Sequence, residues 1–311
     1  MTDSLVLENQ PVCVAKKPKL DWKEVKKSRW PYLFISPFFI LYAIFGAYPT
    51  LYSFYLSLVE WKGLGEKHFV GLDNYILIFK DKLFWHSMGN GVIMFFLYVP
   101  ILTFLALTIA VILNSKRVRG FRFFRTVIFL PYIMNMVAAG FTFRLLLNEK
   151  YGLINVVLEM LKLPTVPWLE SVWGGRISLG LLIIWAWLGY NMVIMLAGLQ
   201  TISSELNEAA YIDGASPVTA FFYITIPLMK PVILFTVVLS TMGSFNLFTE
   251  IWTLTNGGGP MNATLTPIVY IFNQAFTNFR LGYASAGSYV YFLVMFILTL
   301  TQIRFFGNDA D

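Results

Sequence analysis

The sequence predicts an all-α integral membrane protein with six transmembrane helices, on the basis of composition and of six apolar stretches. Hydrophobic residues make up 57% of the 311-residue chain, charged residues make up 13%, and the mean hydropathy is +0.66. A water-soluble domain does not need so much apolar surface. Stretches of about 20 apolar residues with few charges are typical of transmembrane helices. The six stretches are Tyr32–Val59, Gly91–Leu113, Thr126–Leu147, Ile177–Leu199, Val232–Leu254 and Gly287–Phe305.

These stretches form one membrane domain, which we place at residues 31–306 between a basic tail at 1–30 and a short tail at 307–311. The first stretch is longer than a bilayer requires and contains Pro37 and Pro49, so we expect it to be kinked. We expect no cleavable signal peptide, because the residues before the first stretch are polar and basic.

The Lys and Arg residues are unevenly divided between the two sides of the membrane. The side that holds both termini carries fourteen of them and the opposite loops carry eight, with Arg144 inside a stretch. Because positively charged loops tend to remain in the cytoplasm, both termini and the loops at 114–125 and 200–231 are expected there. The net charge of +6 is therefore a topology signal that also favours contact with lipid headgroups. We expect no binding to nucleic acid.

The loop between the fourth and fifth stretches carries signals for two short helices. Ser203 or Ser204 is suited to cap the first helix, and Gly214 is suited to end it. Ser216-Pro217 has the residue types that start a second helix, and Pro227 is expected to end that helix. The sequence therefore predicts a bent pair of helices at the membrane surface.

The same loop reads Glu208-Ala209-Ala210, three residues, Gly214, nine residues and then Ile224-Thr225-Ile226-Pro227. This spacing resembles the EAA loop of ABC importer permeases, and it departs from the family pattern only at Ile226, where the family has Leu. The resemblance implies a cytoplasmic coupling-helix loop, here 200–231, that docks onto an ATPase. The residues expected to couple to the ATPase are Glu208, Ala209, Ala210, Asp213, Gly214, Ala215, Ile224 and Pro227.

Three external segments, Phe69–Tyr75, Gly152–Asn155 and Leu254–Pro260, are also similar to those of sugar permeases, although the last has one extra Gly. The resemblance covers nearly the whole chain from Pro31 onward. The chain looks like the larger membrane subunit of maltose-type importers without its large periplasmic insert. This resemblance implies a permease subunit for a carbohydrate that alternates between inward-facing and outward-facing states.

The resemblance further implies a second permease subunit, two ATP-binding subunits and an extracytoplasmic solute-binding protein, all at the cytoplasmic membrane of a bacterium. The chain has no Gly-x-x-x-x-Gly-Lys-Ser/Thr motif, so ATP and Mg²⁺ are expected on the partner ATPase. We expect no enzyme activity, no catalytic residues and no cofactor in this chain. We also expect no metal site, because His68 and His86 are not grouped with other ligand types.

A path for a sugar needs polar groups that match hydroxyls and aromatic faces set in an apolar wall. The candidates are Trp187, Gly189, Tyr190, Asn191, Ser244, Phe245, Asn246 and Glu250. Structural alternatives remain open. The amides of Asn191 and Asn246 can join helices, and Trp187 can face lipid. Glu250 and Arg144 can each extend to the membrane surface instead of lining a path.

Two other transport functions are alternatives. A permease for a non-sugar solute such as glycerol phosphate would favour basic groups in the path, and the span interiors lack them apart from Arg144. An ion-coupled secondary carrier, which belongs to another class, would place buried carboxylates near mid-membrane and would not carry the Glu208 loop.

Overall fold

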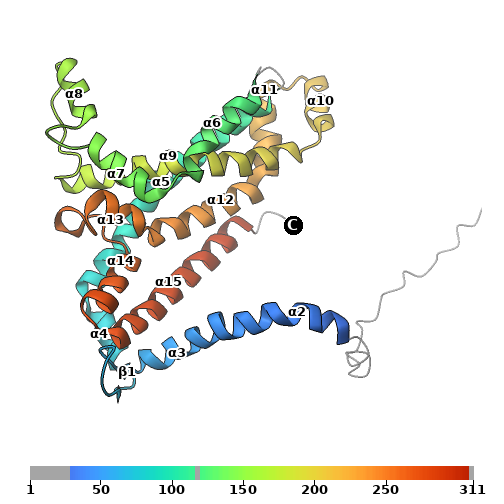
Figure 1. Ribbon diagram of the computed structural model, residues 1–311. Coiled ribbons are helices and arrows are strands. Elements are labelled where there is room, and N and C mark those ends of the chain that lie inside the picture. Colours follow the sequence, from blue (N-terminus) through green and yellow to red (C-terminus); the bar gives the residue numbers. More distant parts are fainter. Residues whose placement is uncertain (1–28, 116–119, 308–311) are drawn as a thin grey trace, which may run out of the picture. The chain divides into compact units, whose positions relative to one another are not determined.

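The computed structural model describes residues 29–115 and 120–307 (Figure 1), so the two predicted tails lie almost wholly outside it. Among the described residues, five helices are long and apolar enough to cross a membrane. The count becomes six if the bent pair α6 (Phe121–Ile133) and α7 (Met136–Leu146) is one span. The prediction of a helical membrane protein is confirmed.

The chain separates into two units, Met1–Tyr52 and Ser53–Asp311, and the described part of the first is one apolar helical rod. The rod consists of α2 (Arg29–Tyr42), a π-helical turn η1 (Ala43–Ala47) and the start of α3 (Tyr48–Ser57). The widened turn comes just before a proline, whose ring nitrogen cannot donate to a regular helix. Most side chains of the rod are exposed, and Phe34 is 82% exposed.

The second unit contains a small antiparallel hairpin, β1 (Val59–Glu60) with β2 (His68–Phe69), followed by helices. The helices are α4 (Asp73–Lys80), α5 (Lys82–Asn114), α6, α7, α8 (Leu153–Met160), α9 (Val172–Gln200), α10 (Ser204–Ile212), α11 (Pro217–Ala220), α12 (Ile226–Asn246), α13 (Thr249–Thr255), α14 (Pro267–Phe272) and α15 (Leu281–Gly307). Three short turns accompany them: η2 (Phe221–Thr225), η3 (Pro260–Asn262) and η4 (Asn273–Thr277).

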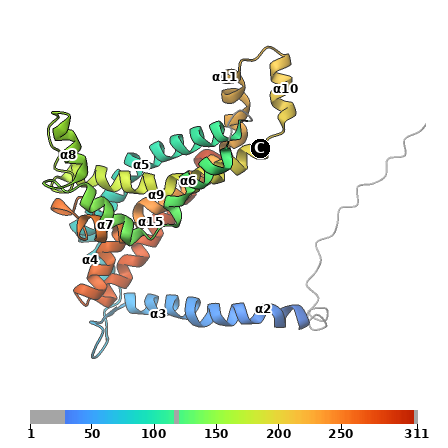
Figure 2. The ribbon, with the colours of Figure 1, turned by 45° about the horizontal axis from the view of Figure 1, so that its top comes forward.

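Helix α9 is the most buried span of the described residues, and it packs against α5, α6 and α12. Figures 1 and 2 show α8 near one end of α9 and α10 near the other. The core between these helices is apolar: Leu182 and Ile183 of α9, Leu102 of α5 and Phe245 of α12 are all almost fully buried. The loops at the two ends of α9 are therefore connected by a single well-packed helix.

The third predicted span, Thr126–Leu147, is not a straight helix. Helices α6 and α7 meet at an angle of 94°. The break is stabilised by Asn135, whose side-chain oxygen accepts hydrogen bonds from Val137 N (2.9 Å) and Ala138 N (3.3 Å). Capping of this kind satisfies amides that a break inside lipid would otherwise leave unpaired.

The fifth predicted span, Val232–Leu254, is placed wrongly at both ends. Its helix begins at Pro217 and stops at Asn246. The chain then leaves helical geometry at Leu247, whose carbonyl accepts a hydrogen bond from the buried Thr266 hydroxyl (2.6 Å). Hydropathy did not register the break because the residues on both sides of it are apolar.

Two asparagines of the external segments secure loops. Asn74 Nδ2 donates to the carbonyls of Ser57 and Val59, both at 3.0 Å. Asn155 is 2% exposed; its Nδ2 donates to the carbonyl of Val166 (3.0 Å) and its Oδ1 accepts from the indole N–H of Trp168 (2.9 Å). Because each side chain satisfies several backbone or indole groups, these segments are ordered connections.

The buried Arg176 holds the Gly-rich turn at 254–260 against the bundle. Its Nη2 donates to Asn90 Oδ1 (3.0 Å) and its Nε donates to the carbonyl of Ala263 (3.1 Å). Asn90 Nδ2 in turn donates to the carbonyls of Asn262 (2.8 Å) and Leu265 (3.0 Å). The turn after α13 is thus joined to both α5 and α9.

Asp81 connects the start of α5 to α14 and α15, and its capping explains why α5 begins nine residues before the predicted Gly91. Its Oδ1 accepts from Leu83 N (2.8 Å), and its Oδ2 accepts from the hydroxyls of Tyr270 (2.6 Å) and Tyr283 (2.7 Å). Burial raises the pKa of Asp81, but the hydrogen bonds from the two tyrosines and the backbone outweigh burial and lower it.

We predict that Asp81→Asn destabilises the protein by about 1–3 kcal/mol at neutral pH, because the charge-assisted hydrogen bonds are lost. The folded pKa is lowered, so this stabilisation is present above the unfolded pKa of about 3.9 and is lost as pH falls through the folded value. The measurement is the thermal unfolding midpoint of purified protein in detergent. Asp73→Asn, at an exposed carboxylate, is the control, and equal midpoints for the two variants would contradict this role.

Candidate functional site

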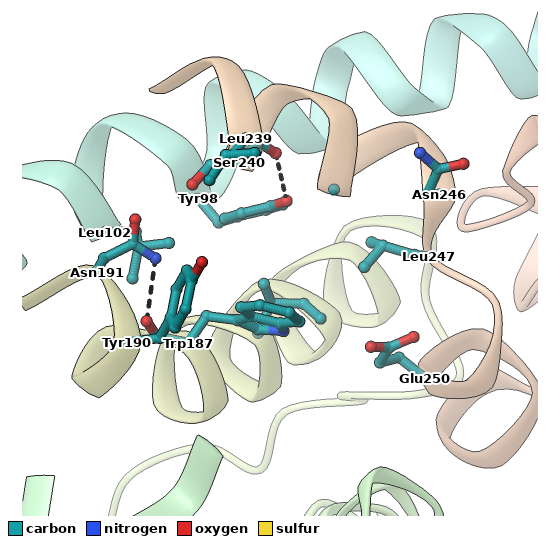
Figure 3. Close-up of a pocket in the computed structure, with 12 residues that line it drawn as sticks. Tyr98, Leu102, Trp187, Tyr190, Asn191, Leu239, Ser240, Asn246, Leu247 and Glu250 are labelled. Carbon is teal, nitrogen blue, oxygen red and sulfur yellow. Dashed lines mark hydrogen bonds between the residues drawn. The ribbon is translucent and has the colours of Figure 1, made fainter. Parts of the chain in front are cut away.

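A cavity of about 240 Å³ lies between α5, α9 and α12, with the start of α13 at one end (Figure 3). Its lining is mostly apolar and aromatic, with a few polar groups, as in typical binding sites for small molecules. The lining residues are Tyr98, Leu102, Ile183, Trp187, Tyr190, Asn191, Leu239, Ser240, Gly243, Asn246, Leu247 and Glu250.

Aromatic rings from α9 and α6 form one wall. Trp187 and Tyr190 are three residues apart and therefore share a face of α9. Tyr132 of α6 packs against both, with ring centroids 5.3 Å from Trp187 and 4.8 Å from Tyr190. Packing of this kind restricts the rings and presents flat apolar surface to the space beside them.

Three polar side chains that line the cavity also make hydrogen bonds within the protein. Asn191 Nδ2 donates to the carbonyl of Trp187 (3.1 Å), while its Oδ1 has no partner among the described residues. Asn246 Oδ1 accepts from the Tyr291 hydroxyl (2.8 Å), and its Nδ2 donates to the carbonyl of Met242. The Tyr98 hydroxyl donates to the carbonyl of Ser240 (3.0 Å). Both asparagines therefore have a structural contact and also line the cavity.

Glu250 is 9% exposed and lies in the first turn of α13, where an acidic side chain complements the helix dipole. Figure 3 shows it at the end of the cavity, near Trp187. Glu250 and Trp187 also line a second cavity of about 330 Å³ that includes Tyr132 and Met134 at the break between α6 and α7. The two side chains thus stand on the boundary between two spaces.

Three predicted path residues lie elsewhere in the packing. Gly189 faces the backbone of α6: a Cβ there would overlap the carbonyl oxygen of Ile128 and lie 2.6 Å from the Cα of Phe129. Ser244 is fully buried and its hydroxyl donates to the carbonyl of Thr241 (2.7 Å). The ring of Phe245 fills the space beside Gly91 of α5.

The sequence interpretation included Trp187, Tyr190, Asn191, Asn246 and Glu250, which do line the cavity. It missed Tyr98 and Ser240 of this cavity, and also Tyr132, which packs against the aromatic wall. The sequence could have indicated the two tyrosines, because a hydroxyl inside an apolar stretch needs a hydrogen-bond partner. The backbone carbonyl of Ser240 accepts the Tyr98 hydroxyl, a role that no sequence pattern marks. Arg144 is absent from this lining, and its Nη1 donates to Asn256 Oδ1 in the external turn (2.6 Å).

The loop after α9 has the predicted bend. Ser203 caps α10 by accepting from Glu205 N (3.3 Å). The helix ends in a Schellman motif, in which Gly214 N donates to the carbonyl of Tyr211 and Ala215 N donates to that of Ala210. Gly214 has φ +83°, a conformation that suits glycine.

The second half of the loop differs from the prediction. Ser216 caps α11 by accepting from Thr219 N (3.1 Å), but Pro227 does not end the helix. The chain passes through the π-helical turn η2 directly into α12, and Pro227 lies in the first turn after it. A widened turn accommodates a residue that cannot donate an N–H. The second helix of the loop is therefore the beginning of the fifth span.

The predicted coupling residues are accessible to a partner. Glu208, Ala209, Asp213 and Gly214 are exposed, as is Pro227. Ala210, Ala215 and Ile224 are partly buried. Large apolar side chains are also exposed on this loop, namely Leu206, Tyr211, Ile212, Val218, Phe222 and Tyr223. Such a patch on α10 and α11 is typical of a protein interface.

Residues 24–307 match the family described as the inner membrane component of binding-protein-dependent transport systems. The chain belongs to this family. It is 37% identical to a lactose transport system permease protein of Rhizobium radiobacter over 279 residues, which cover 89% of this chain and 93% of the relative. It is 34% identical to a trehalose/maltose transport system permease protein of Thermococcus litoralis over 284 residues, which cover 91% and 93% of the two chains.

A solved structure is similar over most of this inner membrane component. It is a bacterial ABC transporter involved in the import of the acidic polysaccharide alginate. The TM-score is 0.81 at 20% sequence identity, and the match covers 93% of this chain and 99% of that chain. The likeness therefore concerns the fold.

We predict that Gly189→Ala destabilises this inner membrane component by about 1–3 kcal/mol, because the added Cβ overlaps the backbone of α6. Gly89→Ala is the matched control, since a Cβ at that exposed helical position meets nothing within 4 Å. The measurement is the unfolding midpoint together with the yield of monodisperse protein. If both variants have the unfolding midpoint and yield of the wild type, the close contact of α6 with α9 at this glycine does not stabilise the protein.

Proposed function

We propose that this chain is the membrane-spanning permease subunit of an ATP-driven, binding-protein-dependent ABC importer for a carbohydrate. The observation that carries the proposal is a cavity with aromatic and hydrogen-bonding lining whose walls, α9 and α12, continue into the loop with exposed Glu208. Relatives named for lactose, arabinooligosaccharides and trehalose/maltose support a saccharide as the cargo.

The cavity chemistry suits a sugar better than a phosphate ester. Sugars combine apolar C–H faces with hydroxyl groups, and the cavity offers the rings of Trp187 and Tyr190 and the amides of Asn191 and Asn246. No Lys or Arg is among its described lining residues, which argues against glycerol phosphate. Membership of a family of binding-protein-dependent components argues against an ion-coupled carrier.

The motor lies outside this chain in our proposal. Two ATP-binding subunits bind ATP and Mg²⁺, and one of them contacts α10 through Glu208 and the exposed apolar residues Tyr211 and Ile212. The chain itself binds no cofactor and catalyses no reaction. Coupling then requires only that the loop and the cavity walls move together, so that ATP binding favours one of two states.

The other proposed partners lie at the outer face of the membrane or within it. The α10 loop and both termini face the cytoplasm of a bacterium, and a solute-binding protein delivers the sugar at the opposite face. A second, different permease chain and lipid cover the exposed apolar surface, which includes the rod formed by α2 and α3.

The test is uptake of radiolabelled lactose, trehalose and maltose by proteoliposomes that contain the complete complex, with and without ATP. We predict ATP-dependent uptake of a saccharide and a loss of about tenfold or more for Gly214→Val. Valine is strained at φ +83°, by about 1–2 kcal/mol, and would open the bend of the loop.

Gly65→Val is the matched control, because Gly65 has φ +82° and open space around it but lies in the external β1–β2 loop. It has the same backbone strain away from the coupling loop, so its uptake should stay near that of the wild type. Absence of uptake of every saccharide by an assembled, ATP-hydrolysing wild-type complex would contradict the proposed function. Equal losses for the two glycine variants would contradict the role of the bend.

A further inference from the structure

Glu250 is the acidic residue among the described residues that line the cavity, and no basic residue accompanies it. None of the residues lining either of the two adjoining cavities is Lys, Arg or His. A carboxylate with no cation beside it directs its negative potential into the space that it faces.

The position of Glu250 makes this potential relevant to transport. Both Glu250 and Trp187 line the 240 Å³ cavity and the 330 Å³ cavity, so a solute that moves from one space to the other passes these two side chains. Their surroundings exclude much of the water, as the 9% exposure of Glu250 shows. Electrostatic interactions are stronger where water is excluded.

A carboxylate beside an aromatic ring recognises one kind of solute and rejects another. Its two oxygens accept hydrogen bonds from neighbouring hydroxyls of a sugar, and a ring packs against the sugar's C–H face. A carboxylate, sulfate or phosphate on the sugar would bring a second negative charge into the same poorly screened space. Repulsion there is not offset by any basic residue of the lining.

We infer that Glu250 is a specificity-determining residue that admits uncharged saccharides and rejects anionic ones. The inference rests on the proposed function, since it assumes that a saccharide passes this cavity. The fold alone does not decide the charge of the cargo, because a structure with the same fold belongs to an importer of the acidic polysaccharide alginate. In our inference, the sign of the charge at Glu250 decides whether a charged sugar is accepted.

The test compares uptake of a neutral disaccharide and its C6 uronate by proteoliposomes with the complete complex. The neutral sugar is whichever of lactose, trehalose and maltose the wild type takes up fastest. We expect Glu250→Gln to raise the ratio of uronate to neutral uptake at least about tenfold, equivalent to about 1.4 kcal/mol. The same binding protein serves every variant, so its own preference cancels when the ratios are compared.

Two further variants serve as controls, one for the charge at position 250 and one for the loss of a carboxylate elsewhere on the surface. Glu250→Asp keeps the charge and should keep the wild-type ratio. Glu170→Gln removes an exposed external carboxylate and should also leave the ratio unchanged. Where the binding protein does not deliver the uronate, equilibrium dialysis of both sugars against the complex without binding protein gives the ratio directly.

A ratio for Glu250→Gln equal to those of the wild type and Glu170→Gln would overturn the inference, as would equal handling of both sugars by the wild type. In either case uptake of the neutral sugar still supports the proposed function. Absence of uptake of all neutral sugars by an assembled wild-type complex overturns the proposed function itself, so the two failures are distinguishable. Assembly of each variant with the ATPase is checked by co-purification.

Discussion

The helical continuity of α9 and of the segment from Pro217 to Asn246 determines how the cavity is connected to the loop that contains α10. Within hydrocarbon, a helix keeps its shape because no water competes for its N–H and C=O groups. Interruptions are tolerated only where side chains replace the lost bonds. Asn135 does so between α6 and α7, and Thr266 does so after α12. Each interruption borders the cavities, so the bends shape the candidate site.

The continuity of the two helices joins the cavity to the predicted coupling loop. Helix α9 carries Trp187 and Tyr190 and leads directly to the loop that begins after Gln200. The loop returns through α11 and η2 into α12, which carries Ser240 and Asn246. In the proposed mechanism, a displacement of α10 reaches one cavity wall through α9 and the other through α11, η2 and α12. Close contacts made by α9, such as that of Gly189 with the backbone of α6, set how near this wall lies to its neighbours.

Much of this arrangement could be predicted from the sequence, and the failures have physical causes. Ser203, Gly214 and Ser216 mark the bend correctly because caps act locally. Pro227 was misjudged, because a π turn that tolerates proline depends on the geometry of the whole helix. The end of the fifth span was missed, because the chain is apolar on both sides of Leu247. Side-chain direction at positions such as Gly189 depends on tertiary packing, which one sequence does not reveal.

A distance measurement tests whether α11, in the predicted coupling loop, and the cavity wall on α12 move as one rigid body. Spin labels at Val218→Cys and Leu239→Cys, with Cys13→Ser to remove the native thiol, lie twenty-one residues apart on the continuous helix from Pro217 to Asn246. At 1.5 Å per residue their helical positions are about 32 Å apart. We predict one narrow distance distribution that is the same in nucleotide-free and ATP-bound complexes. A shift or marked broadening of the distribution on ATP binding would show that the helix bends at η2, and that α11 and the cavity wall do not move as one body.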